Sequence, residues 1–364
     1  MDIFVPVPAM RGKIGSRTYY ACLMPLSAIP NLFKFTDWAG FTPEDREQRV
    51  LNEKRVPELK DYILENEDDY IFSSITASYK STPIFEPAPN GAGDNNLGIL
   101  KLKLGDDLII NDGQHRCAGI TQAVKENEGI GNDTISVLLF PWESKERVQQ
   151  MFTDLNRFVV KTSKSLDILY DKRDKFSAAT LTFLESVPLF QELTDKDNVS
   201  LKAKSPKLFT LAALYDANRE LLRGKEDDPI AENAEILRNY WATVAKHMPD
   251  WSSVFTRHKE ASEMRAQGIS SHSTVLRALG GLGQELMKDP QLGEKLAALE
   301  KINWSKKNQE WENICIVANS VISNRQARAS TKAFIKYKLG LELSDGEWRA
   351  IGREAAKRSE EAIQ

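Results

Sequence analysis

The sequence has few cysteines and histidines, three and four respectively among 364 residues. Cys22, Cys117 and Cys315 lie far apart, which excludes the paired spacing of a zinc site and gives no evident disulfide framework. Four histidines do not make a histidine-rich metal site, so we predict no metal ligands. We expect Cys117 to be packed in the core, and also Cys22, for which a regulatory thiol is the alternative.

Long apolar runs are also missing, and none approaches the roughly 20 residues that cross a bilayer. Met1-Asp2 is acidic and prolines follow, which does not predict a signal peptide. We therefore expect a cytoplasmic protein without a membrane partner. The chain has no excess positive charge either, with 49 basic and 52 acidic residues. A nucleic-acid-binding protein with this balance must concentrate its basic residues locally.

The length allows two domains, and the patterns differ between them. Residues 1–165 alternate strands and helices, which predicts a mixed α/β (α+β) domain. Residues 166–364 have apolar residues at helical spacing nearly throughout, which predicts a helical domain. Expected strands are 3–7, 17–23, 70–79, 97–104, 107–111 and 134–140. Expected helices are 42–54, 57–66, 114–125, 145–156, 165–170, 176–185, 208–223, 231–246, 273–287 and 292–300.

Three details of this prediction concern the first domain. Gly105-Asp106 has the composition of a tight turn, so strands 97–104 and 107–111 should form a hairpin. Strand 134–140 is mostly apolar and should be buried on both faces. Ser144 should cap the helix that follows. In the second domain, Trp241, Trp251, Trp304 and Trp311 are the expected core anchors.

The turn Asp112-Gly113-Gln114-His115-Arg116 is the candidate site. It follows the apolar run 108–110 and opens an expected helix. The unpaired N–H groups and positive dipole end of a helix start can hold an anion, and glycine allows close approach to the backbone. Arg116 offers a planar fork for phosphate, and Asp112 could cap the helix, orient Arg116 or hold a phosphate-bound metal. The plainer interpretation is a capped helix with Arg116 on its surface.

These five residues match the signature of the DGQHR-domain family, and the chain resembles its DndB branch, which is associated with DNA phosphorothioation. Further similar blocks are residues 55–63, 70–76, 152–156, 205–210 and 304–311. The resemblance implies a ParB/sulfiredoxin-like domain over residues 1–165, followed by the helical domain. In that fold a comparable turn ending in arginine binds nucleotide phosphates. Sulfiredoxin has a nucleophilic cysteine where this chain has Gln114, so sulfur reduction is not implied.

The resemblance also implies site residues. Phosphate or nucleotide would contact Gly113, Gln114, Arg116, Ser73, Ser74 and Asn156. Asp112 and His115 would be the catalytic pair, with His115 as a base; a hydrogen-bonding role of His115 in the turn is the alternative. The implied cofactor is a nucleoside triphosphate with Mg²⁺.

Three basic groups are candidates for contact with DNA phosphates. They are Lys161 and Lys164; Lys202 and Lys204; and Arg325, Arg328 and Lys332. The first group lies in a hydroxyl-rich segment that could equally cap a helix. The third lies in a stretch free of acidic residues, 313–341, and a solvated helix face is its alternative.

The function implied by the resemblance is DNA binding and repression of a phosphorothioation gene cluster. The partners would be double-stranded DNA at the promoter of that cluster, other phosphorothioation proteins and further copies of the chain. Two alternatives stay open. One is a DNA-linked nucleotide hydrolase that uses the Asp112–Arg116 turn, and the other is a non-catalytic accessory subunit of the modification complex.

Overall fold

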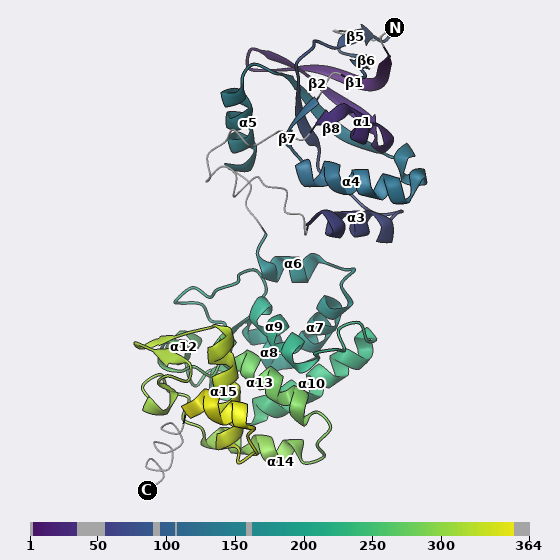
Figure 1. Ribbon diagram of the computed structural model, residues 1–364. Helices are drawn as coiled ribbons and strands as arrows, with labels where there is room; N and C mark the ends of the chain where they lie inside the picture. The colour runs from purple at the N-terminus through teal and green to yellow at the C-terminus, as the bar shows by residue number, and fades with distance from the viewer. Residues whose placement is uncertain (1–2, 35–54, 90–94, 106–107, 158–161, 353–364) are drawn as a thin grey trace. The chain divides into compact units, whose positions relative to one another are not determined.

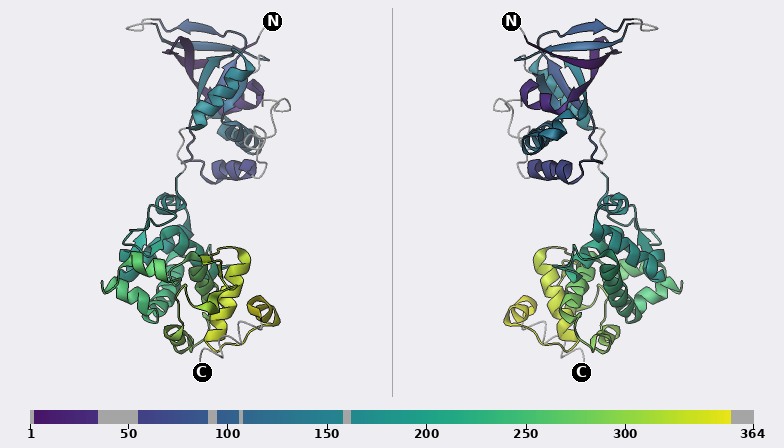
Figure 2. Two further views of the ribbon diagram at one scale, coloured as in Figure 1. Left: turned by 90° about the vertical axis from the view of Figure 1, so that its left-hand side faces the viewer. Right: turned by 90° about the vertical axis from the view of Figure 1, so that its right-hand side faces the viewer.

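The computed structural model describes residues 3–34, 55–89, 95–105, 108–157 and 162–352 (Figures 1 and 2). The chain divides into two compact units, Met1–Val160 and Lys161–Gln364, and each is described by itself. The helix expected over 42–54 lies outside the described residues. Among the residues that are described, no helix has both the length and the apolar character that a membrane crossing requires.

The first unit contains one eight-stranded mixed sheet. Its strands, in spatial order, are β3 (Phe33–Lys34), β7 (Leu108–Asp112), β4 (Ile75–Tyr79), β8 (Thr134–Pro141), β2 (Arg17–Pro25), β1 (Phe4–Ile14), β6 (Leu97–Lys103) and β5 (Ile84–Pro87). The pairs β3–β7 and β4–β8 are parallel, and the other neighbours are antiparallel. The predicted mixed α/β class is therefore confirmed.

Helices cover both faces of this sheet (Figures 1 and 2). α4 (Gln114–Glu126) packs between the sheet and α3 (Arg55–Glu65), and α1 (Ile29–Leu32) lies on the same face. α3 approaches α4 at Gly119, where a Cβ would lie 2.7 Å from the Cβ of Leu59, so a larger residue would push the helices apart. α5 (Lys145–Arg157) lies on the opposite face, and Ser144 caps it as predicted, accepting a bond from the Arg147 N–H.

Three strand predictions were wrong. β6 pairs with β1 and β5, whereas β7 pairs with β3 and β4, so the two form no hairpin. The turn between them gave no information about which distant strands each would join. β8 alternates buried with half-exposed residues, because only one of its faces meets the core. The strand expected from Tyr70 begins only at Ile75.

The second unit is helical, as predicted. Its α-helices are α6 (Lys164–Tyr170), α7 (Lys175–Ser186), α8 (Pro188–Leu193), α9 (Leu211–Leu221), α10 (Ile230–Lys246), α11 (Pro249–Phe255), α12 (Ala261–Gln267), α13 (Ser273–Leu286), α14 (Leu292–Ala297) and α15 (Arg325–Lys338). Short strands also occur: β9 (Thr194–Asp195) with β10 (Phe209–Thr210), and β11 (Ile316–Val317) with β12 (Ser320–Val321). The four predicted tryptophan anchors are all buried in one core.

Candidate functional site

The Asp112–Arg116 turn joins β7 to α4 through a left-handed glycine. Gly113 has φ of +102°, a conformation that residues with a Cβ rarely adopt. A Cβ there would also lie 3.3 Å from Cγ1 of Ile75 and 3.4 Å from Cζ of Arg116. Glycine is therefore needed for both the backbone angle and the space.

Arg116 is largely enclosed, with its side chain 17% exposed. Its Nη1 donates to the carbonyl oxygens of Ser73 and Ser74, at 2.6 and 2.7 Å, and to the Ser73 hydroxyl at 2.7 Å. Its Nη2 donates to Oδ2 of Asp112 at 2.6 Å. The interpretation of Arg116 as a surface residue was wrong. The guanidinium ties the start of α4 to the segment before β4.

The bonds of Arg116 also determine the roles of Asp112 and the two serines. Asp112 does not cap α4, since the helix start has no side-chain cap; it orients Arg116 instead. The Ser74 hydroxyl lies 2.6 Å from that of Ser136, so both predicted serines already have protein partners. A phosphate at this turn would compete with these internal bonds. Binding of nucleotide here stays a prediction, and the side chain of Asn156 is outside the described structure.

His115 is half-buried at the start of α4. Burial and the nearby charge of Arg55 lower the pKa of His115, so its imidazole is neutral at neutral pH. A neutral imidazole suits either predicted role, base or hydrogen-bonding group. Gln114 beside it is also half-buried. Among the described residues no cluster of three or more His, Cys, Asp or Glu side chains could hold a metal ion.

The three cysteines are packed, as expected for Cys22 and Cys117. Cys22 is 2% exposed and Cys117 is 1% exposed. Burial raises the pKa of each of these thiols to about 12. Arg17 does not activate Cys22, since its guanidinium is bonded to Glu143. The geometry therefore disfavours a reactive thiol at Cys22.

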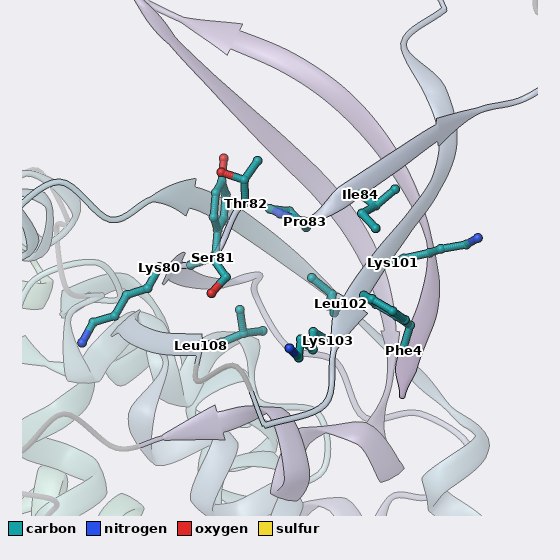
Figure 3. A pocket seen from close by; sticks show the side chains of 11 residues that line it. Phe4, Lys80, Ser81, Thr82, Pro83, Ile84, Lys101, Leu102, Lys103 and Leu108 are labelled. Atoms are coloured by element: carbon teal, nitrogen blue, oxygen red, sulfur yellow. The ribbon is translucent and has the colours of Figure 1, made fainter. Parts of the chain in front are cut away.

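A cavity of about 260 Å³ lies elsewhere in the first unit (Figure 3). It is lined by Leu108, Tyr79 and lysines that include Lys80 and Lys103. Leu108 begins β7 and Asp112 ends it, so this cavity lies about 13 Å from the turn, at the other end of the strand. It is therefore not part of the Asp112–Arg116 site.

Some residues of the predicted DNA-binding groups form ion pairs with carboxylates, and others do not. Lys161 lies outside the described residues. Lys164 is paired with Asp216 at 2.5 Å, and Ser163 caps α6, which supports the capping interpretation of that segment. Lys332 is paired with Glu285. The acid-free stretch was therefore misleading at Lys332, because acids distant in the sequence fold against it.

Lys202 and Lys204 are exposed on a loop that one arginine holds in place. Arg265 donates from Nη2 to the carbonyls of Lys202 and Ala203, at 3.0 and 2.9 Å. It also donates from Nη1 to the carbonyls of Ser205, at 2.8 Å, and Lys207. Sequence reasoning missed Arg265, which carries no local signal of this role. The bonds from Arg265 hold the backbone of the loop, and the side chains of Lys202 and Lys204 remain exposed.

Arg325 and Arg328 lie with Lys332 along one side of a cavity in the second unit. Arg223 and Arg277 also line it, and sequence reasoning did not single them out. The available signal was the spacing of the three α15 residues, i, i+3 and i+7, which places them on one helix face.

Comparison with known families gives one match over almost the whole chain. The model of the DndB family, described as DNA-sulfur modification-associated, matches residues 7–342. Comparison with curated proteins and with solved structures gave no significant match. The ParB/sulfiredoxin likeness of the first unit therefore stays a prediction. The extent of the family match shows that this chain belongs to the DndB family of DNA-sulfur modification-associated proteins.

Proposed function

We propose that this protein binds double-stranded DNA in the cytoplasm, at the promoter of its own gene cluster, and represses a DNA phosphorothioation system. Membership of the DndB family supports the involvement in DNA sulfur modification. The regulatory role and the DNA contact are our proposal. Regulation would act through occupancy of the promoter, with the second unit supplying cations for the phosphate backbone.

The observation that carries the DNA contact is the loop held by Arg265. A flexible lysine loop would lose conformational entropy on binding, whereas this loop is already fixed through four of its own carbonyls. Lys202 and Lys204 project from it and have no ion pair with a described carboxylate. Two unpaired cations on an ordered loop are suited to adjacent phosphates of a duplex.

The test is equilibrium binding of the full chain to a duplex carrying the promoter of its gene cluster and to a scrambled duplex, each over a range of salt concentrations. The wild type should prefer the promoter duplex and lose affinity as salt rises. Lys202→Gln with Lys204→Gln should reduce the slope of log affinity against log salt by about 1.8, because each phosphate contact contributes about 0.9.

The matched control is Lys246→Gln with Lys288→Gln, which removes the same charge from exposed lysines of the second unit. Its slope should equal that of the wild type. Equal slopes for all three proteins would contradict the assignment of the loop. No preference for the promoter, together with unchanged expression of a promoter-driven reporter, would contradict repression itself.

A further inference from the structure

The cavity between α9, α13 and α15 has an unusual lining. It is about 310 Å³ in volume, within the range of small-ligand sites. Its lining is Glu220, Arg223, Arg277, Ala278, Gly281, Gln284, Arg325, Arg328, Ala329 and Lys332. Five cations therefore surround it, and one carboxylate. In a chain whose formal net charge is −3, this is a concentrated positive site.

The three helices build this cavity through residue spacing. Arg277, Gly281 and Gln284 on α13 are separated by four and three residues, so they share one face. Arg325, Arg328 and Lys332 share the facing side of α15. α13 packs against both α9 and α15. Small residues also line the cavity, namely Ala278, Gly281 and Ala329.

Internal acids offset only part of this charge. Glu220 accepts from Arg277 at 2.6 Å and from Arg223. Burial acts to raise the pKa of Glu220, but bonds from these two arginines hold it below the usual range, so Glu220 is charged at neutral pH. Lys332 is paired with Glu285. Asp216 lies 3.7 Å from Arg277 and Glu347 lies 3.8 Å from Lys332. These acids act on Arg223, Arg277 and Lys332, and none of them pairs with Arg325 or Arg328.

The arginines of α15 have few partners within the described structure. Arg325 and Arg328 form no ion pair with a described carboxylate, and the one bond of the Arg328 guanidinium is a 3.4 Å contact to the Ser323 carbonyl. The Nε of Arg277 is buried and has no hydrogen-bond partner among the described residues. A buried donor without an acceptor is costly, so the protein itself does not fully satisfy the guanidinium of Arg277.

Arg325 also stands where a cation is unfavourable for the fold. It is the first residue of α15, where the positive end of the helix dipole repels it. Folding therefore does not account for a positive charge at this position. An anion in the cavity would interact favourably with both the arginine and the helix start.

We propose that this cavity binds a phosphate group, through the arginine forks of Arg325 and Arg328 together with Arg277. Guanidinium forks match the paired oxygens of phosphate, and several converging cations suit a multiply charged group. The phosphate comes either from the backbone of duplex DNA or from a free phosphorylated ligand. Only the DNA source rests on the proposed function.

The first arm of the test is calorimetric titration of the full chain with pyrophosphate. The variant Arg325→Gln with Arg328→Gln should bind at least tenfold more weakly than the wild type, and it should fold, because it removes a cation from a helix start. Arg219→Gln with Arg238→Gln is the matched control on exposed helical sites outside the cavity, with affinity expected within twofold of the wild type.

A second variant tests the space rather than the charge. Ala329→Leu keeps every cation and adds a side chain on an exposed residue of the lining. It should weaken pyrophosphate binding several-fold. If the arginine variant, Ala329→Leu and the control all bind pyrophosphate like the wild type, the proposal is overturned for a free ligand.

The second arm uses a duplex of arbitrary sequence as the probe. If the arginine variant loses duplex affinity and about 1.8 of the salt slope, the phosphate is that of DNA. If it loses pyrophosphate alone, the ligand is free. A wild type that binds pyrophosphate but no DNA would refute the proposed function and keep this site. A wild type that binds DNA, with neither probe affected by the variant, would keep the function and refute this site.

Discussion

Two arginine sites of this protein use the same side chain in opposite ways. At the Asp112–Arg116 turn the guanidinium of Arg116 donates to acceptors within the protein, namely one carboxylate, two carbonyls and a hydroxyl. At the cavity of the second unit, Arg325 and Arg328 have no described carboxylate partner. The difference shows that the partners of an arginine, rather than the sequence around it, tell whether the fold already satisfies its guanidinium.

The largest effect should come from removing the arginine that the fold uses. Arg116→Ala leaves Asp112 and two carbonyls without a donor, and we expect the first unit to lose about 2–3 kcal/mol of stability. The loss of stability is measured by urea denaturation, with hydrogen exchange of segment 70–79 as the readout. Arg17→Ala, which breaks the more exposed pair with Glu143, should cost far less. Equal losses of stability in Arg116→Ala and Arg17→Ala would contradict the distinction between the two arginine sites, because Arg116 would then behave as an ordinary surface residue.

The glycine of the turn should come next. Gly113→Ala places a Cβ at φ of +102° and within 3.4 Å of Ile75 and Arg116, so we expect a loss of about 1–2 kcal/mol. Gly224→Ala is a sharp control, since Gly224 also has a positive φ but has nothing within 4 Å of its added Cβ. Thermal unfolding should show Gly113→Ala as the more destabilised variant. The reverse order would mean that crowding at the turn has no effect.

Each unit also contains a histidine that resists protonation. Burial first, then Arg55 for His115 and Lys306 for His272, lowers both pKa values in the folded state. The unfolded state therefore binds protons more readily, and stability should fall as pH drops below about 6.5. His115→Gln should flatten this decline in the first unit only. Hydrogen exchange at pH 7.5 and 5.5 measures it, and an unchanged profile would contradict the lowered pKa.

The smallest effect concerns the thiols. Burial raises the pKa of Cys22 and Cys117 to about 12 and that of Cys315 to about 11, so none should be a thiolate at pH 8. Native protein should react with Ellman's reagent at a small fraction of the rate of urea-unfolded protein. Rapid modification of one thiol in the native state would restore the regulatory interpretation, and Cys22→Ser would identify it.

Sequence patterns predicted those parts of the fold that depend on local spacing. The helices of the second unit follow apolar periodicity, and Ser144 acts as the predicted cap because capping is a local interaction. Ser163 also acts as a cap, and capping was one of the two interpretations of its segment. Sheet order was not predictable in this way. β6 and β7 are separated by a few residues but join different neighbours, because their pairing is decided by long-range burial.

The site shows the same division. The left-handed turn at Gly113 follows from a glycine between a strand and a helix, so the sequence could indicate it. The partners of Arg116 could not be predicted, since the carbonyls of Ser73 and Ser74 are contributed by the backbone of a distant segment. The presence of Arg223 and Arg277 in the cavity could not be predicted for a similar reason. Neither is near α15 in the sequence, and helix packing brings them there.

The most direct test of this comparison is the pyrophosphate affinity of two folded variants, Arg116→Ala and the pair Arg325→Gln with Arg328→Gln. Circular dichroism would first establish that each is folded at the temperature of titration. We predict that the turn variant binds like the wild type and that the cavity variant binds at least tenfold more weakly. Loss of binding in the turn variant, with normal binding in the cavity variant, would contradict the account and make the turn the phosphate site.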